Sequence, residues 1–135
     1  MFNYFIQCIS LKYLNFSDRS RRKEFWSFVL FRYIINVAIA LHKRIYVEEF
    51  ISTEEEFRYT IILFFIFIAF LLPSIAVSIR RMHDVGKSGW YMLIPIYNII
   101  LCFTDSEPGE NEYGPNPKGI GNTDDADVLI QSIGQ

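Results

Sequence analysis

A run of 21 residues without a charged side chain constrains this chain more than any other feature. It covers residues 59–79 and is dominated by Ile, Leu and Phe. At a rise of about 1.5 Å per residue, a helix of this length crosses the roughly 30 Å hydrocarbon core of a bilayer. We therefore predict a transmembrane helix here. Pro73 should kink it, and neighbouring helices can satisfy the carbonyl that proline frees.

Two further apolar segments accompany that run. Residues 25–42 are long enough for a span only if flanking residues join in, and Trp26 stands at their start, where an interfacial aromatic belongs. Residues 89–104 are shorter and contain Pro95, so a thin span, a tilted span and a re-entrant hairpin are all consistent with them. The working prediction is about three transmembrane helices.

Both ends of the chain differ from these segments. Residues 1–16 are apolar but too short to span, and Asn3, Gln7 and Ser10 share one helical face. We predict an amphipathic N-terminal helix in the headgroup boundary, with a helix in the core of the bundle as the alternative. Residues 119–135 read as a disordered acidic tail beyond a single domain at residues 1–118. The fold class is thus an all-α membrane protein.

Composition agrees with this class. Of the 135 residues, 51% are hydrophobic and 17% are aromatic, which is unusual for a soluble domain of one-domain length. Cys8 and Cys102 lie far apart in apolar runs, so we expect buried thiols rather than a disulfide framework. The N-terminus has no basic leader before its apolar residues and no small-residue cleavage site, so no secretory signal is expected.

The cations are distributed unevenly along the chain. With three spans, one side of the membrane holds eight: Lys12, Arg19, Arg21, Arg22, Lys23, Arg80, Arg81 and Lys87. The other side holds four: Lys43, Arg44, Arg58 and Lys118. The positive-inside rule then predicts a multi-pass protein with a cytoplasmic N-terminus and an external tail. A short third segment that turns back would instead return the tail to the cytoplasm.

Three motifs resemble one known family. The first joins residues 13–16 to the basic run and Glu-Phe-Trp of residues 19–26. The second is the Arg-Arg-Met-His-Asp loop and Ser-Gly-Trp of residues 80–91, and the third is residues 109–117. Together they resemble the bacterial family called domain of unknown function 805, the YhaH-like inner-membrane proteins, over roughly residues 1–118. The resemblance implies an inner-membrane location and no particular activity. The Glu-rich connector at residues 43–58 is not a feature of it.

Several polar residues fall inside the apolar segments. Arg32 lies near the middle of the first, where a charge costs about 2.5–3.5 kcal/mol on insertion scales. The others form weaker stripes along the three segments: Asn36, Ser74, Ser78 and Asn98. They indicate either a polar cavity for an ion or solute, or interhelical hydrogen bonds and snorkelling of Arg32.

Two basic groups are candidate binding sites. Arg21 and Arg22 belong to a cluster that attracts anionic lipid, although a topology signal alone would also explain it. The loop with Arg80, Arg81, His83 and Asp84 is the best candidate for a phosphate or a lipid headgroup. The alternative for that loop is a structural turn.

The motifs of other function classes are missing from the sequence. There is no nucleophile elbow, no glycine-rich phosphate loop and no metal-ligand spacing, so we expect no catalytic residue, metal or cofactor. Nucleic acid is not an expected partner, because the basic patch is short and lies against a membrane. We predict a non-enzymatic module that binds anionic phospholipid or a membrane partner. The alternative is an oligomeric transporter or channel subunit for a small solute or ion, and the third is an enzyme that processes a lipid or phosphate ester through His83 and Asp84.

Overall fold

The computed structural model describes residues 1–47 and 52–122, and within these ranges the fold is helical. The elements follow in chain order: α1 (Phe2–Ile9), α2 (Arg22–His42), the π-helical turn η1 (Lys43–Val47), α4 (Thr53–Asp84), the 3₁₀ helix η2 (Gly89–Leu93) and α5 (Pro95–Phe103). The predicted all-α class is confirmed.

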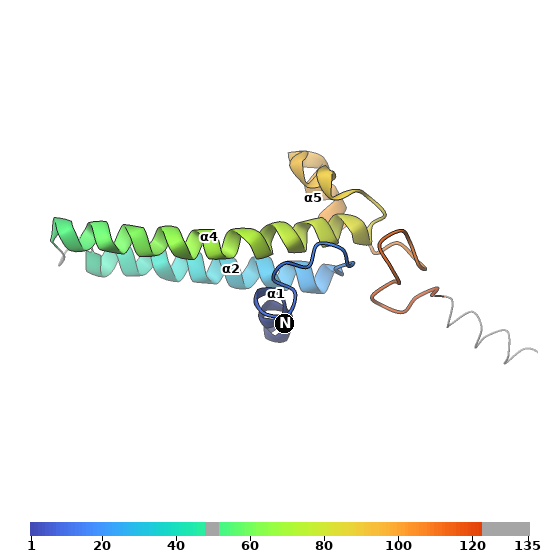
Figure 1. The fold of residues 1–135 in the computed structure, drawn as a ribbon, viewed down its shortest axis with the longest axis horizontal. Helices are drawn as coiled ribbons and strands as arrows, with labels where there is room; N and C mark the ends of the chain where they lie inside the picture. The colour runs from blue at the N-terminus through green and yellow to red at the C-terminus, as the bar shows by residue number, and fades with distance from the viewer. Residues whose placement is uncertain (48–51, 123–135) are drawn as a thin grey trace, which may run out of the picture.

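Helices α2 and α4 form a long antiparallel hairpin that sets the shape of the molecule (Figure 1). Among the described residues, two helices are long and apolar enough to cross a membrane, Arg22–Ile45 and Thr53–Asp84. The 32 residues of α4 correspond to about 48 Å, so the helix is longer than the hydrocarbon core. Its charged C-terminal turn therefore projects beyond the spanning segment predicted at residues 59–79.

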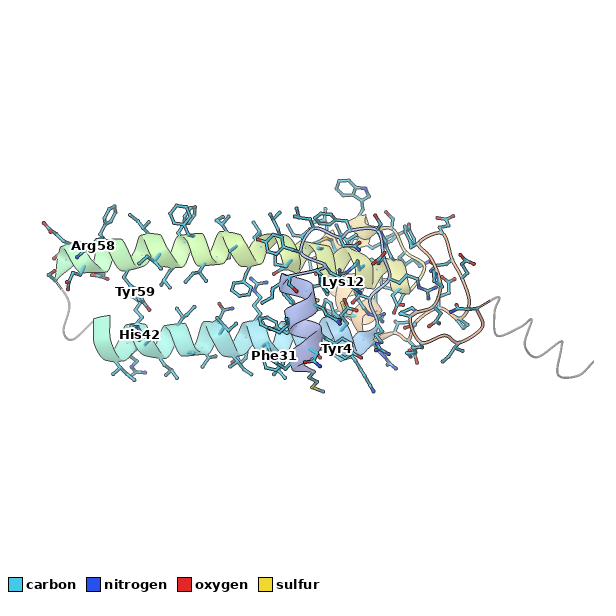
Figure 2. All side chains as sticks on the ribbon, turned by 60° about the horizontal axis from the view of Figure 1, so that its bottom comes forward. Tyr4, Lys12, Phe31, His42, Arg58 and Tyr59 are labelled. Carbon is cyan, nitrogen blue, oxygen red and sulfur yellow. The ribbon has the colours of Figure 1, made fainter. Side chains whose placement is uncertain are left out.

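The contacts between α2 and α4 differ along the length of the hairpin. At the far end of the hairpin, His42 and Tyr59 face one another (Figure 2). Their rings stack with centroids 5.6 Å apart, and His42 Nδ1 lies 3.1 Å from the Tyr59 hydroxyl. Around them the apolar side chains point outward, as Phe64 and Phe65 do. Such a surface suits acyl chains and would be an aggregation hazard in water.

Pro73 lies inside α4, which continues through it. Proline has no N–H, so the carbonyl of Ala69, four residues earlier, loses its helical donor. The hydroxyl of Tyr13 donates a 2.6 Å hydrogen bond to that carbonyl. The carbonyl that proline leaves free is therefore satisfied from outside α4, by a residue of the turn after α1 and not by one of the neighbouring helices that the sequence prediction named.

Helix α1 lies across the hairpin (Figure 1). Phe5 is buried with its ring centroid 5.9 Å from that of Phe28, 5.4 Å from Phe31 and 6.4 Å from Phe70. Cys8, one turn later, is also buried, whereas Gln7 is exposed. The N-terminal segment is therefore an amphipathic helix, and its apolar face packs on the hairpin.

Residues 89–104 do not form the one continuous helix that a third span requires, and their course is that of the re-entrant alternative. The segment divides into η2 and α5, with Ile94 between them in an extended conformation. The residue before a proline disfavours the helical region, and Pro95 then occupies the first turn of a new helix. The nine residues of α5 correspond to about 14 Å, which is too short to cross a bilayer.

Because this segment turns back, residues 104–122 return to the end of the hairpin that carries the N-terminal region (Figure 1). The Ser20 amide donates to the Arg80 carbonyl at 3.0 Å, and the Glu107 amide donates to the Asp84 carbonyl at 2.9 Å. The prediction that these parts lie on opposite sides is therefore wrong for the described tail. Of the predicted acidic tail, Ile120 and Gly121 form a turn, and residues 123–135 lie outside the described residues. We call residues 10–24, 80–88 and 104–122 the polar head.

Candidate functional site

The polar head contains charged side chains that are removed from solvent. Arg80, Arg81 and Asp84 have no exposed surface, and Arg19 and Glu24 keep only 4% and 5% of theirs. Burial of a charge is tolerated only where it is paired and hydrogen-bonded. The partners of each group therefore decide whether the head can bind a ligand.

Asp84 is the centre of the larger cluster. Its Oδ1 accepts from Arg19 Nε at 3.4 Å, and its Oδ2 accepts from Arg81 and, at 2.6 Å, from the Ser106 hydroxyl. Arg81 also donates to the carbonyls of Leu101 and Thr104. One carboxylate thus joins the first and second sequence motifs and, through Ser106, the segment that leads into the third.

Arg19 holds the returning tail in place. Its guanidinium donates to the carbonyl of Gly109 at 2.7 Å, to that of Gly114 at 3.1 Å and to that of Asp84 at 3.3 Å. Gly109 has a φ of 76°, a conformation that favours glycine, so the turn can present this carbonyl. Every donor group of Arg19 is used by the chain itself.

A second cluster joins α1 to α4. Arg80 lies 3.2 Å from Glu24 Oε1, which also lies 3.6 Å from Lys12 Nζ. Arg80 donates to the Cys8 sulfur at 3.5 Å. Burial, supported by the Glu24 carboxylate and opposed by Arg80, raises the pKa of the Cys8 thiol to about 11. The thiol is protonated at neutral pH and is not an activated nucleophile.

His83 differs from its charged neighbours. It is 8% exposed, and its ring stacks on Tyr113 with centroids 3.7 Å apart and planes 4° from parallel. Burial lowers the pKa of His83, and hydrogen bonding to the backbone of Asp18 and Ser17 opposes that shift. Nδ1 of His83 has no hydrogen-bond partner within the described part of the chain.

The candidate binding residues fall into two groups, one buried inside the polar head and one at its surface. Arg80, Arg81 and Asp84 come together, but they face inward, and Ser88 precedes a helix of only five residues. This arrangement favours the structural interpretation of that loop. Arg21 and Arg22 are half-buried at the surface, and Arg22 pairs with Asp105 at 3.1 Å.

A surface groove beside Arg21 is the polar opening of the head. It has a volume of about 560 Å³, and its walls come from α1, α2 and the loops around them: Met1, Asn3, Tyr4, Gln7, Lys12, Arg19, Arg21, Glu24 and Pro117. The Arg21 guanidinium lies 5.1 Å from the centroid of the Tyr4 ring and donates to the Tyr4 hydroxyl. We call this opening the arginine groove.

Among the members of the arginine groove that sequence reasoning missed are Tyr4, in α1, and Lys12, just after it (Figure 2). Lys12 entered only the count of charges, and Tyr4 counted only as an apolar residue. A signal was present, since Asn3 and Gln7 mark the polar face of α1 that lines the groove. The path of the chain after Ile9, which brings Lys12 back to this face, has no such signal.

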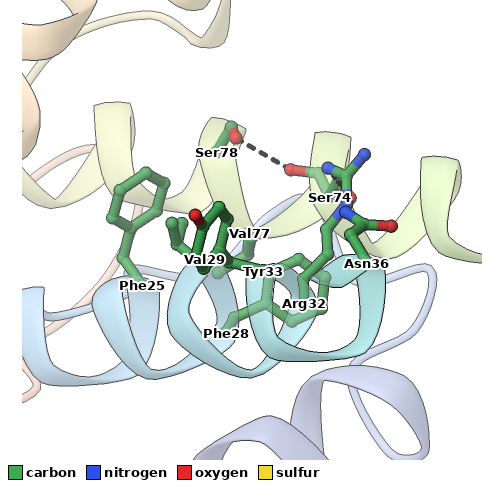
Figure 3. Close-up of a pocket in the computed structure, with 9 residues that line it drawn as sticks. All are labelled: Phe25, Phe28, Val29, Arg32, Tyr33, Asn36, Ser74, Val77 and Ser78. Atoms are coloured by element: carbon green, nitrogen blue, oxygen red, sulfur yellow. Dashed lines mark hydrogen bonds between the residues drawn. The ribbon is translucent and has the colours of Figure 1, made fainter. Parts of the chain in front are cut away.

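A second opening lies between α2 and α4, at the level of the spans (Figure 3). Arg32 donates to the Ser74 hydroxyl at 2.8 Å, and the Ser78 hydroxyl donates to the Ser74 carbonyl at 2.8 Å. Asn36 lies beside them in a cavity of about 240 Å³. Within residues 1–47 and 52–122, no carboxylate lies within ion-pair distance of Arg32.

The third predicted polar stripe does not join this cavity. Asn98 donates to the Met92 carbonyl at 2.9 Å, and its side-chain oxygen accepts from the Cys102 thiol at 3.2 Å. Asn98 therefore satisfies a carbonyl at the break between η2 and α5. In the described part of the chain, no group of three or more His, Cys, Asp or Glu side chains is placed to hold a metal ion.

Comparison with known proteins identifies one family. The family model described as "Protein of unknown function (DUF805)" matches residues 13–115. The inner membrane protein YhaH of Escherichia coli (strain K12) is 34% identical over 113 residues, which cover 78% of this chain and 89% of YhaH. The inner membrane protein YhaI of the same strain is 35% identical over 113 residues, covering 78% of this chain and 88% of YhaI. No solved structure matches the chain.

Proposed function

The chain belongs to the family described as "Protein of unknown function (DUF805)", whose named relatives are inner membrane proteins, and on that premise we propose that it is a non-enzymatic membrane module that binds anionic phospholipid. The observation that carries this proposal is the arginine groove. In it a surface guanidinium rests on an aromatic ring beside a lysine.

The charge balance of the head supports an anionic ligand. The two buried carboxylates are already engaged, Asp84 with Arg19 and Arg81, and Glu24 with Arg80. Arg21 has no carboxylate partner among the described residues. A guanidinium without a carboxylate partner offers two parallel N–H donors that match the oxygens of a phosphate. Each such cation near an anionic surface contributes about 1 kcal/mol.

The orientation of the chain supports the same proposal. With two spans, the head side carries nine cations, namely the eight counted above and Lys118, which now lies on that side. The connector side carries three: Lys43, Arg44 and Arg58. The positive-inside rule then favours a cytoplasmic polar head and a cytoplasmic N-terminus. The cytoplasmic leaflet is where an anionic surface would meet the arginine groove.

The test compares lipids that differ in headgroup charge. The full chain in dodecyl maltoside is titrated with phosphatidylglycerol or phosphatidylcholine, and bound lipid is counted by native mass spectrometry. We expect phosphatidylglycerol to bind more tightly, and Arg21→Gln or Lys12→Gln to weaken it about fivefold each, since each removes one cation. Lys23→Gln is the matched control, because Lys23 is exposed outside the groove. Equal binding of the two lipids by the unchanged protein would refute the proposal.

A second candidate rests on Arg32. Its guanidinium lies at mid-span with one hydroxyl partner, and the neighbouring cavity is lined by Asn36 and Ser78. A homo-oligomer that faces several such cavities together would line a polar path for a small solute or ion. This candidate requires self-association, so a strictly monomeric protein in nanodiscs would exclude it. The enzyme hypothesis gains no support from Asp84, whose oxygens bond to Arg19, Arg81 and Ser106.

A further inference from the structure

The cavity between α2 and α4 contains Arg32, and no carboxylate in the described part of the chain pairs with it. Arg32 lies seven residues beyond Phe25, where the first apolar segment begins, which corresponds to about 10 Å along α2. Ser74 of α4 holds the guanidinium at this depth (Figure 3). Ser74 itself lies five residues before Ile79, the last residue of the uncharged run. The charge is therefore inside the hydrocarbon region.

Most of the hydrogen-bonding capacity of this guanidinium is unused among the described residues. Its Nη1 donates to the Ser74 hydroxyl, which in turn donates to the Phe70 carbonyl. The opposite edge, with the donors on Nε and Nη2, is the edge that binds a carboxylate through two parallel hydrogen bonds. Asn36, one turn after Arg32, lines the same cavity and makes no hydrogen bond within the described part of the chain. Arg32 is only half-buried and Asn36 is exposed, so both can be reached from outside the hairpin.

A second copy of this chain cannot neutralise Arg32. Residues 25–42 and 59–79 contain no Asp or Glu, so self-association would bring only further arginines to this depth. The one carboxylate of α2 is that of Glu24, which is already paired with Arg80. A phospholipid phosphate belongs to the headgroup layer and would have to leave it to reach the guanidinium. The remaining source of a counter-charge is a carboxylate that another protein carries into the membrane.

The walls of the cavity suit the approach of a third helix. Ser74 and Ser78 are four residues apart on α4, and small residues at this spacing let membrane helices approach closely. Val29 of α2 and Val77 of α4 form the apolar part of the lining. The cavity has a volume of about 240 Å³, which leaves room for one acidic side chain.

We propose that this cavity docks a transmembrane helix of a partner protein, and that the helix carries one Asp or Glu at the depth of Arg32. The carboxylate binds the free edge of the guanidinium, and Asn36 donates to the same helix. Either charge is costly alone inside the bilayer, so pairing relieves both costs. This inference uses no residue of the arginine groove and does not rest on the proposed lipid binding.

The experiment uses a synthetic transmembrane helix as the probe. Its leucine–alanine segment is about 20 residues long and carries one Asp at the depth of Arg32, and a matched peptide carries Leu there. The full chain is reconstituted in phosphatidylcholine, which has no net charge, and energy transfer from its tryptophans to a dansyl group on the peptide measures binding. We expect the Asp peptide to bind about fivefold to thirtyfold more tightly than the Leu peptide. Equal binding of the two peptides by the unchanged protein overturns the proposal.

Substitutions in the cavity separate the charge from the fold. Arg32→Leu removes the cation and only one hydrogen bond, so the helices should form and the two peptides should bind equally. Arg32→Lys keeps the cation and should retain most of the preference for Asp. Ser78→Leu fills the cavity and should weaken both peptides, whereas Ala38→Leu, at an exposed position of α2 outside the cavity, should not. A preference for Asp that survives Arg32→Leu overturns the role of the arginine.

A lipid headgroup is the competing occupant, and the same variants detect it. Phosphatidylglycerol bound to the unchanged protein and to Arg32→Leu is counted by native mass spectrometry. Loss of one bound lipid in the variant, together with equal binding of the two peptides by the unchanged protein, would assign the guanidinium to a headgroup and overturn the proposal. Arg21→Gln removes a cation of the arginine groove and should leave the preference for Asp unchanged. Failure here is therefore distinguishable from failure of the lipid proposal.

Discussion

The two ends of the hairpin are built on different physical principles. At the polar head, Arg19, Arg81 and Asp84 are buried in a network that joins segments up to 95 residues apart in the sequence. At the far end, His42 and Tyr59 stack between the two helices, and large apolar side chains such as Phe64 and Phe65 are exposed. The comparison teaches that a protein of this size can expose an apolar surface to the bilayer at one end and form its buried polar network at the other.

The largest effect expected from this comparison is an all-or-none difference in labelling. In a chain with Cys8 and Cys102 replaced by Ala, single cysteines are placed at Glu112 in the head or at Glu55 in the connector, both exposed. With a cytoplasmic head, an impermeant maleimide should label Glu55→Cys in intact cells but Glu112→Cys only after lysis. Labelling of Glu112→Cys in intact cells would reverse the orientation, and with it the argument from the cytoplasmic leaflet.

Removal of the central carboxylate should affect the head much more than the far end. Asp84→Asn leaves Arg19 and Arg81 buried without their counter-charge, and breaking a buried pair costs about 3–5 kcal/mol. Proteolysis in detergent should then cut residues 104–122 far sooner, while far-UV circular dichroism retains the helices. Glu55→Gln breaks only an exposed 3.8 Å pair with Arg58 and should cost less than about 1 kcal/mol. Similar losses in the two variants would remove the distinction between the ends.

The head should also respond to pH through His83. Its pKa is lowered in the folded state, so the unfolded chain binds the proton more readily. The stabilising contribution is complete above the ordinary value of 6.5 and is lost as the pH falls below it. The slope is at most about 1.4 kcal/mol per pH unit. Thermal unfolding between pH 7.5 and 5 measures it, with His83→Phe as the control, in which this part of the slope should vanish. A slope unchanged by that substitution would assign it to another group.

The smallest effect concerns the contact of Tyr13 with the proline site in α4. Tyr13→Phe removes the donor to the Ala69 carbonyl and should cost about 1 kcal/mol. Pro73→Ala restores the helical N–H, so Tyr13→Phe should cost less in that background. A double-mutant cycle on thermal stability measures the coupling. Independent effects of the two substitutions would show that the hydroxyl does not serve the freed carbonyl.

Local sequence rules predicted α2 and α4 because each element depends on its own residues. The uncharged run at residues 59–79 is long enough to span by itself, and Pro73 identified a carbonyl in need of a donor. The same rules contained the warning at Pro95, which starts α5 and ends any continuous span. Pro95 left both a span and a re-entrant hairpin open for residues 89–104, and the packing of η2 and α5 against α4 decided between them.

The sequence by itself determined that this chain is helical, belongs to a membrane and carries its cations unevenly, because hydropathy, helix length and charge are properties of single segments. Only the tertiary structure decided that Arg80 and Arg81 are internal supports, whereas Lys12 and Arg21 line a surface groove. A cation in a basic loop has the same local signature in either role. Its role depends on whether carbonyls and carboxylates from distant segments, such as Leu101, Thr104 and Glu24, arrive within hydrogen-bond distance.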